Sequence, residues 1–231
     1  MRSRENWTSA IRTSVVLAFG GTDLETWADP LFHDLPAGPA VLLSFGAVEY
    51  GGRQMVEKLR SAGLERLSRV QRPVRVVEAG LAAQFNEISV VSALMGAGFV
   101  YLQGGNPRTI VSELANTDFW SQVLEQRLPV IATSGSSMAL GTRCPDMAPG
   151  KTGWVDGLNL VPDALLAAHW DSFHAKDPQF RASFESEAGS RRLFAIEDKV
   201  ALRLNGGEQA HGEGTVQVLQ EGIWRKVAAT T

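Results

Sequence analysis

Short apolar runs that end in turn residues recur through the first 140 positions of the chain. Each run is rich in β-formers and has almost no polar interruption, which is typical of strands buried on both faces of a parallel sheet. Glycine or a cluster of small polar residues follows most of them. The runs are Val15–Phe19, Ala40–Phe45, Val74–Val77, Phe99–Leu102 and Pro129–Thr133.

Segments with helical spacing of apolar residues lie between these runs. They are Arg53–Ala62, with Gly63 as its expected C-cap, Asn86–Met95, Ile110–Leu114 and Trp120–Glu125. Strands alternating with helices predict an α/β fold, in which a mostly parallel sheet carries helices on both faces.

The C-terminal part has a different pattern, in which apolar and polar positions alternate. This alternation covers Lys199–Leu204 and Thr215–Leu219, and the turn sequence Asn205-Gly206-Gly207 lies between them. We therefore expect an antiparallel pair near the C-terminus that finishes the sheet. No linker composition or internal repeat interrupts the chain, so residues 1–231 are expected to form a single domain.

Composition narrows the class of protein. Hydrophobic residues make up 44% and charged residues 20%, and the net charge is −3 with scattered Lys and Arg, which argues against a nucleic-acid partner. A lone cysteine favours a reducing compartment, and no apolar run approaches the roughly 18 residues of a membrane span. These features predict a cytoplasmic protein that does not enter a membrane.

Two turns at the ends of predicted strands carry candidate chemistry. Gly135-Ser136-Ser137-Met138-Ala139 resembles the nucleophile elbow G-x-S-x-G, with alanine in the last place. This match predicts Ser137 as nucleophile and the Met138 N–H as an oxyanion donor, and Gly105 of the neighbouring turn would supply a second N–H. The alternative is a serine-rich helix N-cap, because Ser134, Ser136 and Ser137 are all good capping residues.

A serine nucleophile needs a base and an acid that orients the base. Of the four histidines, His33, His174 and His211 lie in polar or glycine-rich stretches, whereas His169 follows the apolar run Ala164–Ala168. We therefore expect His169 to be the base, with a partly buried structural histidine as the alternative. The acid is open between Asp146, Asp156 and Asp163, each of which is equally suited to a turn or a cap. Zinc-ligand spacing is absent from the sequence, so no metal or cofactor is predicted.

Several short motifs, taken in order over roughly residues 14–222, resemble the dipeptidase E and cyanophycinase family of serine peptidases. They are the Gly20-Gly21 turn, Tyr101–Pro107 (YLQGGNP), Ala132–Ala139 (ATSGSSMA), Asp146-Met147, Gly157–Pro162 (GLNLVP), His169-Trp170 and Ala195–Leu202 (AIEDKVAL). The resemblance implies a class I glutamine-amidotransferase-like, or flavodoxin-like, arrangement and a Ser-His-acid triad. It places the acid at Asp146 and implies cleavage of peptide bonds at acidic residues.

The leading hypothesis is thus a serine peptidase or amidase that acts on a small peptide, as a monomer or homodimer, through Ser137, His169 and Asp146. Asn106 and Arg143 are candidate substrate contacts because they lie near the two turns, and Arg108 is a further one. The elbow departs from the family pattern, with Ser-Met-Ala in place of Ser-Ala-Gly. This departure motivates a second hypothesis, an inert homologue that binds a ligand or partner in the same cleft. A third is an acyl hydrolase or esterase with the same triad.

Overall fold

The computed structural model of the chain describes residues 15–21, 26–147, 153–174, 177–204 and 207–228. Its largest sheet has seven strands in the order β11-β10-β1-β5-β4-β2-β3. In chain order these strands are β1 (Val16–Phe19), β2 (Ala40–Leu43), β3 (Val74–Val76), β4 (Phe99–Leu102), β5 (Val130–Thr133), β10 (Val200–Leu204) and β11 (Glu208–Gly212).

Two smaller sheets complete the strands of the described chain. A four-stranded sheet has the order β13-β12-β9-β8, and a hairpin joins β6 to β7. Their bounds are β6 (Arg143–Pro145), β7 (Trp154–Asp156), β8 (Ala164–Ala167), β9 (Arg192–Ile196), β12 (Val216–Gln220) and β13 (Ile223–Lys226).

Helices fill most of the connections. The α-helices are α2 (Asp29–His33), α3 (Val48–Arg69), α4 (Ile88–Val91), α5 (Pro107–Leu114), α6 (Asp118–Glu125), α7 (Gly135–Ala139) and α8 (Pro178–Ala188). Short 3-10 turns are η2 (Thr26–Ala28), η3 (Phe45–Ala47), η4 (Gln84–Asn86) and η5 (Ser92–Leu94), and η6 (Trp170–His174) is π-helical.

The larger sheet is mostly parallel, as predicted. β1, β5, β4, β2 and β3 pair in parallel with one another. β10 then pairs antiparallel with β1, and β11 antiparallel with β10. Because all five parallel strands end at the same edge of the sheet, the turns that follow them gather there.

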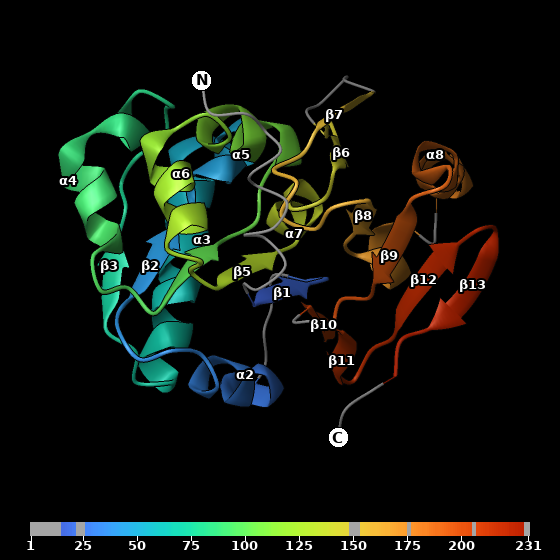
Figure 1. Cartoon of the computed structure of the whole chain (residues 1–231), viewed down its shortest axis with the longest axis horizontal. Helices are drawn as coiled ribbons and strands as arrows, with labels where there is room; N and C mark the ends of the chain where they lie inside the picture. The colour runs from blue at the N-terminus through green and yellow to red at the C-terminus, as the bar shows by residue number, and fades with distance from the viewer. Residues whose placement is uncertain (1–14, 22–25, 148–152, 175–176, 205–206, 229–231) are drawn as a thin grey trace.

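Alternate residues of the central strands enter two separate cores. Ala18, Val41 and Val100 share one core with residues of α5 and α6, and that core continues into the smaller sheet through Leu166, Phe194 and Val218. Leu17, Leu42 and Tyr101 share the other with Phe32 of α2 and Leu67 of α3. The helices therefore cover both faces of the sheet, and Figure 1 shows them grouped around it, with α8 beside the smaller sheet.

Three details differ from the sequence-based expectation. β10 pairs with β11, whereas β12 pairs with β9 and β13 in the smaller sheet, so the predicted partner of the 199–204 strand is wrong. Part of the predicted connecting turn, residues 205–206, lies outside the described residues. Helix α3 runs through Gly63 and does not end there, so Gly63 is not its C-cap. A Cβ on Gly63 would lie 2.5 Å from Gln103 Nε2, so close packing explains this glycine. The predicted helix 86–95 is one α-helical turn, α4, between η4 and η5.

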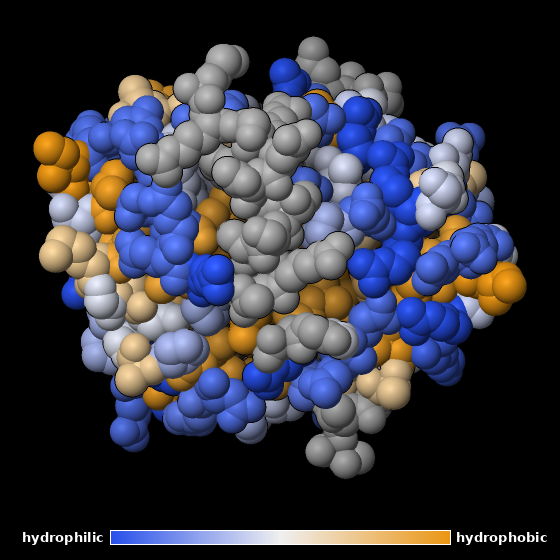
Figure 2. Space-filling model, viewed as in Figure 1, coloured by the Kyte–Doolittle hydropathy of each residue, from blue (hydrophilic) through white to orange (hydrophobic). Residues whose placement is uncertain are grey.

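Polar side chains make up much of the described surface in Figure 2, and apolar groups lie at its left edge, where Figure 1 places α4, and at its right edge. Ile88 at the start of α4 is 85% exposed. None of the helices in the described part of the chain combines the length and apolar character needed to cross a bilayer.

Candidate active site

Four segments that follow parallel strands meet between the two larger sheets of the molecule. The parallel register pairs Phe19 of β1 with Thr133 of β5, so Gly20 and Ser134 come next at the same level. In the smaller sheet Ala167 of β8 pairs with Ala195 of β9, which brings residues 169 and 198 to the corresponding end. The site thus lies where the two sheets adjoin.

Ser134 has the backbone of a nucleophile elbow. It follows β5 directly and precedes α7, with φ 55° and ψ −126°. A serine in this region of φ/ψ space is strained, at a cost of roughly 1–3 kcal/mol, and such outliers concentrate at functional sites. The Ser134 N–H donates to Phe19 O at 3.0 Å, and its carbonyl accepts from the Ser137 N–H at 2.9 Å. The strained turn is therefore held at both ends.

A line of side-chain hydrogen bonds runs outward from this serine. Ser134 Oγ lies 2.7 Å from His169 Nε2, and His169 Nδ1 lies 2.5 Å from Asp198 Oδ1. An ionised carboxylate only accepts, so the proton on Nδ1 points to Asp198, and Nε2 is left as the acceptor for the serine hydroxyl. About a third of the Asp198 side chain and about a quarter of the His169 side chain are exposed (33% and 27%).

The backbone around the histidine and the aspartate is tightly packed against the end of β1. His169 has φ 56°, and its N–H donates to Gly20 O at 3.2 Å. A Cβ on Gly20 would lie 1.9 Å from Glu197 O, and one on Gly21 would lie 2.8 Å from Asp198 O. Glycine is therefore required at both positions for the 197–198 segment to approach.

The turn after β4 lies against the elbow. Gly104 N–H donates to Thr133 Oγ1 at 3.1 Å, and Ser136 Oγ donates to Gln103 O at 2.6 Å. A Cβ on Gly135 would lie 1.8 Å from Gly105 O, so only glycine permits this approach. The Gly135 N–H is the first of α7, and the first N–H groups of a helix have no partner within it. The arrangement brings the backbones of Gly105 and Gly135 together beside Ser134.

Two solved structures share this architecture. One is described as a peptidase from an acI-B1 Actinobacterium, with TM-score 0.75, 16% identity, and coverage of 95% of this chain and 96% of that chain. The other is described as a "putative peptidase E protein" from Listeria monocytogenes EGD-e, with TM-score 0.61, 16% identity, and coverage of 93% and 99%. The chain has a peptidase E-like fold. No protein-family model and no curated protein matches its sequence.

The peptidase E-like fold confirms the resemblance drawn from the short motifs, yet it places Ser137 away from the predicted role. Ser137 Oγ lies 2.8 Å from Phe19 O and 2.9 Å from Ala132 O, and the residue is fully buried. Its hydroxyl therefore fastens α7 to the ends of β1 and β5. The structure pairs His169 with Ser134 instead, three residues earlier.

Met138 is likewise placed inside the protein. Its N–H donates to Ser134 O at 3.3 Å, within the first turn of α7, and its side chain is buried beside Leu165 and Trp170. The predicted oxyanion donor is thus occupied by a helical hydrogen bond. With Ser134 at the elbow, the residue that follows it is Gly135, which lies against Gly105.

Asp146 lies beside Arg108 and not beside His169 Nδ1, whose carboxylate partner is Asp198. Asp146 Oδ2 is 2.7 Å from Arg108 Nη1, and Asp146 Oδ1 is 3.4 Å from Asn106 Nδ2. Asn106 is fully buried and caps α5, and its Oδ1 accepts from the N–H groups of Arg108 and Met147. Its amide group therefore holds two loops together.

The other acid candidates also have different surroundings. Asp156 ends β7 and lies 3.4 Å from Arg143, with 80% of its side chain exposed. Asp163 occupies a turn at φ 53°, directly before β8. Asp163 thus has the turn role that was its alternative, whereas Asp156 is an exposed residue at the end of a strand.

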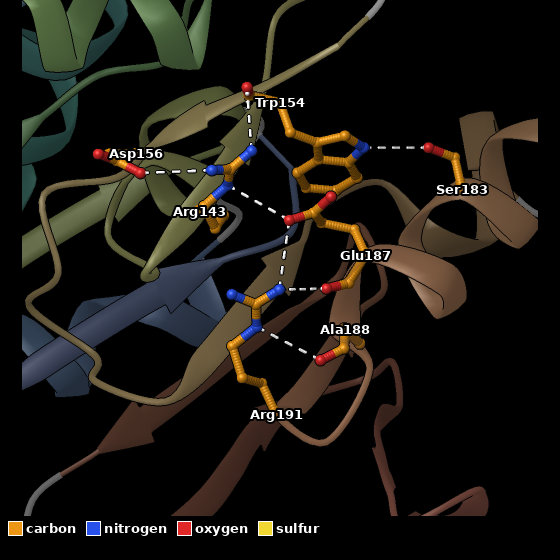
Figure 3. A network of polar contacts seen from close by, with 7 residues as sticks. All are labelled: Arg143, Trp154, Asp156, Ser183, Glu187, Ala188 and Arg191. Carbon is orange, nitrogen blue, oxygen red and sulfur yellow. Dashed lines mark hydrogen bonds and ion pairs between the residues drawn. The ribbon is translucent and has the colours of Figure 1, made fainter.

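Arg143 joins β6 to α8 in the polar network of Figure 3. Its guanidinium donates to Trp154 O at 3.1 Å and lies 3.3 Å from Glu187 Oε1, which also pairs with Arg191 at 3.2 Å. The predicted substrate contact is therefore engaged in a structural network.

Sequence reasoning missed Ser134 and Asp198 for identifiable reasons. The elbow motif G-x-S-x-G, with Gly135 as its first glycine, puts the nucleophile at Ser137. An elbow nucleophile directly follows its strand, however, and β5 ends at Thr133. The strand boundary was the signal that selects Ser134 among the neighbouring serines. Asp198 follows the apolar run that forms β9, and its position after a strand end was the corresponding signal.

The structure also bears on two other kinds of chemistry, a cysteine nucleophile and a bound metal ion. Burial raises the pKa of the Cys144 thiol to about 12, so this thiol stays protonated at neutral pH. Among the described residues, no group of three or more His, Cys, Asp or Glu side chains is placed to hold a metal ion.

Proposed function

We propose that the protein is a serine peptidase or amidase that hydrolyses a small peptide, with Ser134 as nucleophile. The observation that carries this proposal is the line from Ser134 through His169 to Asp198, which starts at a strained residue at the end of a parallel strand. A serine hydroxyl is a weak nucleophile unless a base accepts its proton, and this line supplies the base and its orienting acid.

Each residue of the line has a defined part in the proposed reaction. Ser134 Oγ attacks the peptide carbonyl carbon while His169 Nε2 takes its proton. The same nitrogen then gives the proton to the leaving amine as the C–N bond breaks, which leaves an acyl-enzyme. Water, deprotonated by His169 Nε2, then attacks the acyl carbon. The ester bond to Ser134 breaks, His169 returns the proton to Ser134 Oγ, and the acid product leaves. Asp198 fixes the tautomer of His169 and stabilises the imidazolium formed in both steps.

The developing oxyanion would be held by backbone N–H groups of Gly135 and Gly105. Gly104 N–H is used by Thr133, and Asn106 N–H donates to Gly46 O at 2.8 Å, which leaves the Gly105 N–H as the candidate of its turn. Removal of one such donor typically lowers the rate by about 10²–10³.

The choice of a peptide substrate is supported by the peptidase descriptions of both structural neighbours. Cleavage beside an acidic residue stays a prediction of the motif resemblance. The two arginines considered as contacts for an acidic substrate residue already have carboxylate partners, since Arg108 pairs with Asp146 and Arg143 with Glu187. Either arginine must leave its partner to bind the substrate. Arg108 is the better candidate because half of its side chain is exposed.

A fluorophosphonate probe tests the nucleophile directly. We would label the wild type, Ser134→Ala and Ser137→Ala, and map the modified peptide by mass spectrometry. The expected result is a label on Ser134 that disappears in Ser134→Ala and persists in Ser137→Ala. A label on Ser137 would restore the elbow alignment drawn from sequence. A folded wild type that takes no label would establish the inert binding homologue instead.

Substrate comparison then separates a peptidase from an esterase. Asp-X and Asn-X dipeptides would be offered beside matched small acyl esters, and amine or alcohol release would be measured. Dipeptide hydrolysis that depends on Ser134 supports the proposal, and a preference for Asp-X over Asn-X supports the acidic specificity. Ester hydrolysis without amide hydrolysis would identify an acyl hydrolase.

A further inference from the structure

A second carboxylate, that of Asp171, contacts the acid of the proposed triad through its backbone. Asp171 Oδ1 accepts from the Asp198 N–H at 2.9 Å. Asp171 belongs to η6, two residues after His169, so one short segment reaches residue 198 twice. The His169 ring contacts the Asp198 side chain, and the Asp171 carboxylate contacts the Asp198 main chain.

This double contact fixes Asp198 itself, whereas its chain neighbours are held by bonds of their own: the Glu197 N–H donates to Thr215 O at 3.2 Å, and Lys199 O accepts from the Glu213 N–H at 2.9 Å. Asp198 lies in the connection between β9, in the smaller sheet, and β10, in the larger one. Gly21 packs against the Asp198 carbonyl, but a third of the Asp198 side chain is open to solvent. A hydrogen bond from a backbone N–H to a carboxylate is stronger than one to a neutral acceptor, and here it constrains the residue that orients the base.

We infer that Asp171 is a positioning residue for the Ser134–His169–Asp198 triad. Its carboxylate oxygen holds the Asp198 main chain at the distance at which the Asp198 side chain meets His169 Nδ1. This inference rests on the proposed function for its catalytic consequence, whereas its structural consequence can be measured without any turnover.

The chain offers a conservative variant and a matched control. Asp171→Asn keeps an oxygen acceptor and removes the charge, whereas Asp171→Ala removes both. Asp177 is also an exposed carboxylate that accepts backbone N–H groups, from Gln179 at 2.9 Å and Phe180 at 3.2 Å, but it caps α8. Asp177→Ala therefore removes the same kind of bond six positions along the chain, at a place with no part in the triad.

The first readout is the far-downfield proton NMR signal of His169 Nδ1–H, recorded in the Ser134→Ala background so that catalysis plays no part. Asp198→Asn, which should abolish the signal, assigns it. We expect Asp171→Ala to broaden or remove the signal through faster exchange with solvent, and Asp171→Asn and Asp177→Ala to retain it. An unchanged signal in Asp171→Ala would overturn the inference, whether or not the enzyme hydrolyses peptides.

The second readout is kinetic, with the fluorophosphonate labelling rate and the hydrolysis of the best dipeptide measured in parallel. We expect Asp171→Ala to lower kcat about tenfold at little change in KM, with Asp171→Asn within about threefold of the wild type. Loss of activity in Asp171→Asn equal to that in Asp171→Ala would show that an acceptor oxygen at this position does not hold residue 198, and would overturn the positioning role. Equal losses in Asp171→Ala and Asp177→Ala would reduce it to general stability.

Discussion

The two sides of the candidate site are held in different ways. Ser134 lies on the larger sheet, where the neighbouring Ser136 and Ser137 are fully buried and bonded to strand-end carbonyls. His169 and Asp198 approach from the smaller sheet with partly exposed side chains. The nucleophile is thus positioned by the core, whereas the base and the acid are positioned by a few backbone contacts. Substitutions on the elbow side should therefore change stability, whether or not they change the rate, and those on the other side should change mainly the rate.

The largest effect is expected at the nucleophile itself. Ser134→Ala and Ser134→Gly should each lower kcat by about 10⁴-fold or more, because no other group forms the acyl-enzyme. The two variants should differ in stability. Glycine relieves the strain at φ 55° and ψ −126°, so the unfolding free energy of Ser134→Gly should be about 1 kcal/mol higher than that of Ser134→Ala. Denaturant titration and single-turnover assays measure both effects. Equal stability would contradict a strained elbow.

Removal of the acid tests the other side of the comparison. Asp198→Asn should lower kcat by about 10²–10⁴-fold through loss of the tautomer control of His169, with a change in stability below about 1 kcal/mol. Asp146→Asn is the control, since Asp146 pairs with Arg108 and was the acid expected from the motif resemblance. Kinetics and thermal unfolding of both variants decide between them, and a severe loss in Asp146→Asn alone would return the role to Asp146.

A substitution at the contact between Gly135 and Gly105 should lower both the stability and the rate. In Gly135→Ala the new methyl group would lie 1.8 Å from Gly105 O, so the turns must separate. We expect a loss of about 1–3 kcal/mol in unfolding free energy and about 10²-fold in kcat, because an oxyanion donor is displaced. Gly207→Ala, where the added methyl group meets nothing within 4 Å, should change neither quantity. A fully active Gly135→Ala would remove this turn from the proposed oxyanion site.

Sequence patterns predicted the strands of the larger sheet except β11, whose residues were interpreted as part of a glycine-rich turn, because the other strands are local signals. β4 and β5 were predicted within one residue of their bounds, since each is a buried apolar run that ends in a turn. Strand partners were harder, because alternation identifies a strand without choosing its neighbour. The 199–204 strand and the 215–219 strand were therefore found but wrongly paired.

The site was predictable to the level of the elbow segment and the histidine, but not of the individual serine and acid. The four residues 134–137 include three serines, so composition alone does not select one of them. Only the position of the strand end distinguishes a strained nucleophile from a buried cap. Asp198 becomes a partner of His169 only because Gly20 and Gly21 admit the 197–198 segment, a contact between remote parts of the chain.

The smallest functional effect is expected at Ser137, which sharpens the distinction between support and chemistry on the elbow side. Ser137→Ala removes the hydroxyl that lies within 2.9 Å of Phe19 O and Ala132 O and leaves the Ser134–His169 contact in place. The two carbonyl oxygens lose the one buried hydroxyl proton that they share, so unfolding free energy should fall by about 1–2 kcal/mol. Activity below the unfolding transition should stay within about threefold of the wild type. Ser137→Cys, which keeps a weak donor of similar size, should lose less stability than Ser137→Ala. Denaturant titration measures the change in stability, and steady-state kinetics measures the change in activity. A 10³-fold fall in kcat for a stably folded Ser137→Ala would place the nucleophile at Ser137, in α7, and not at Ser134.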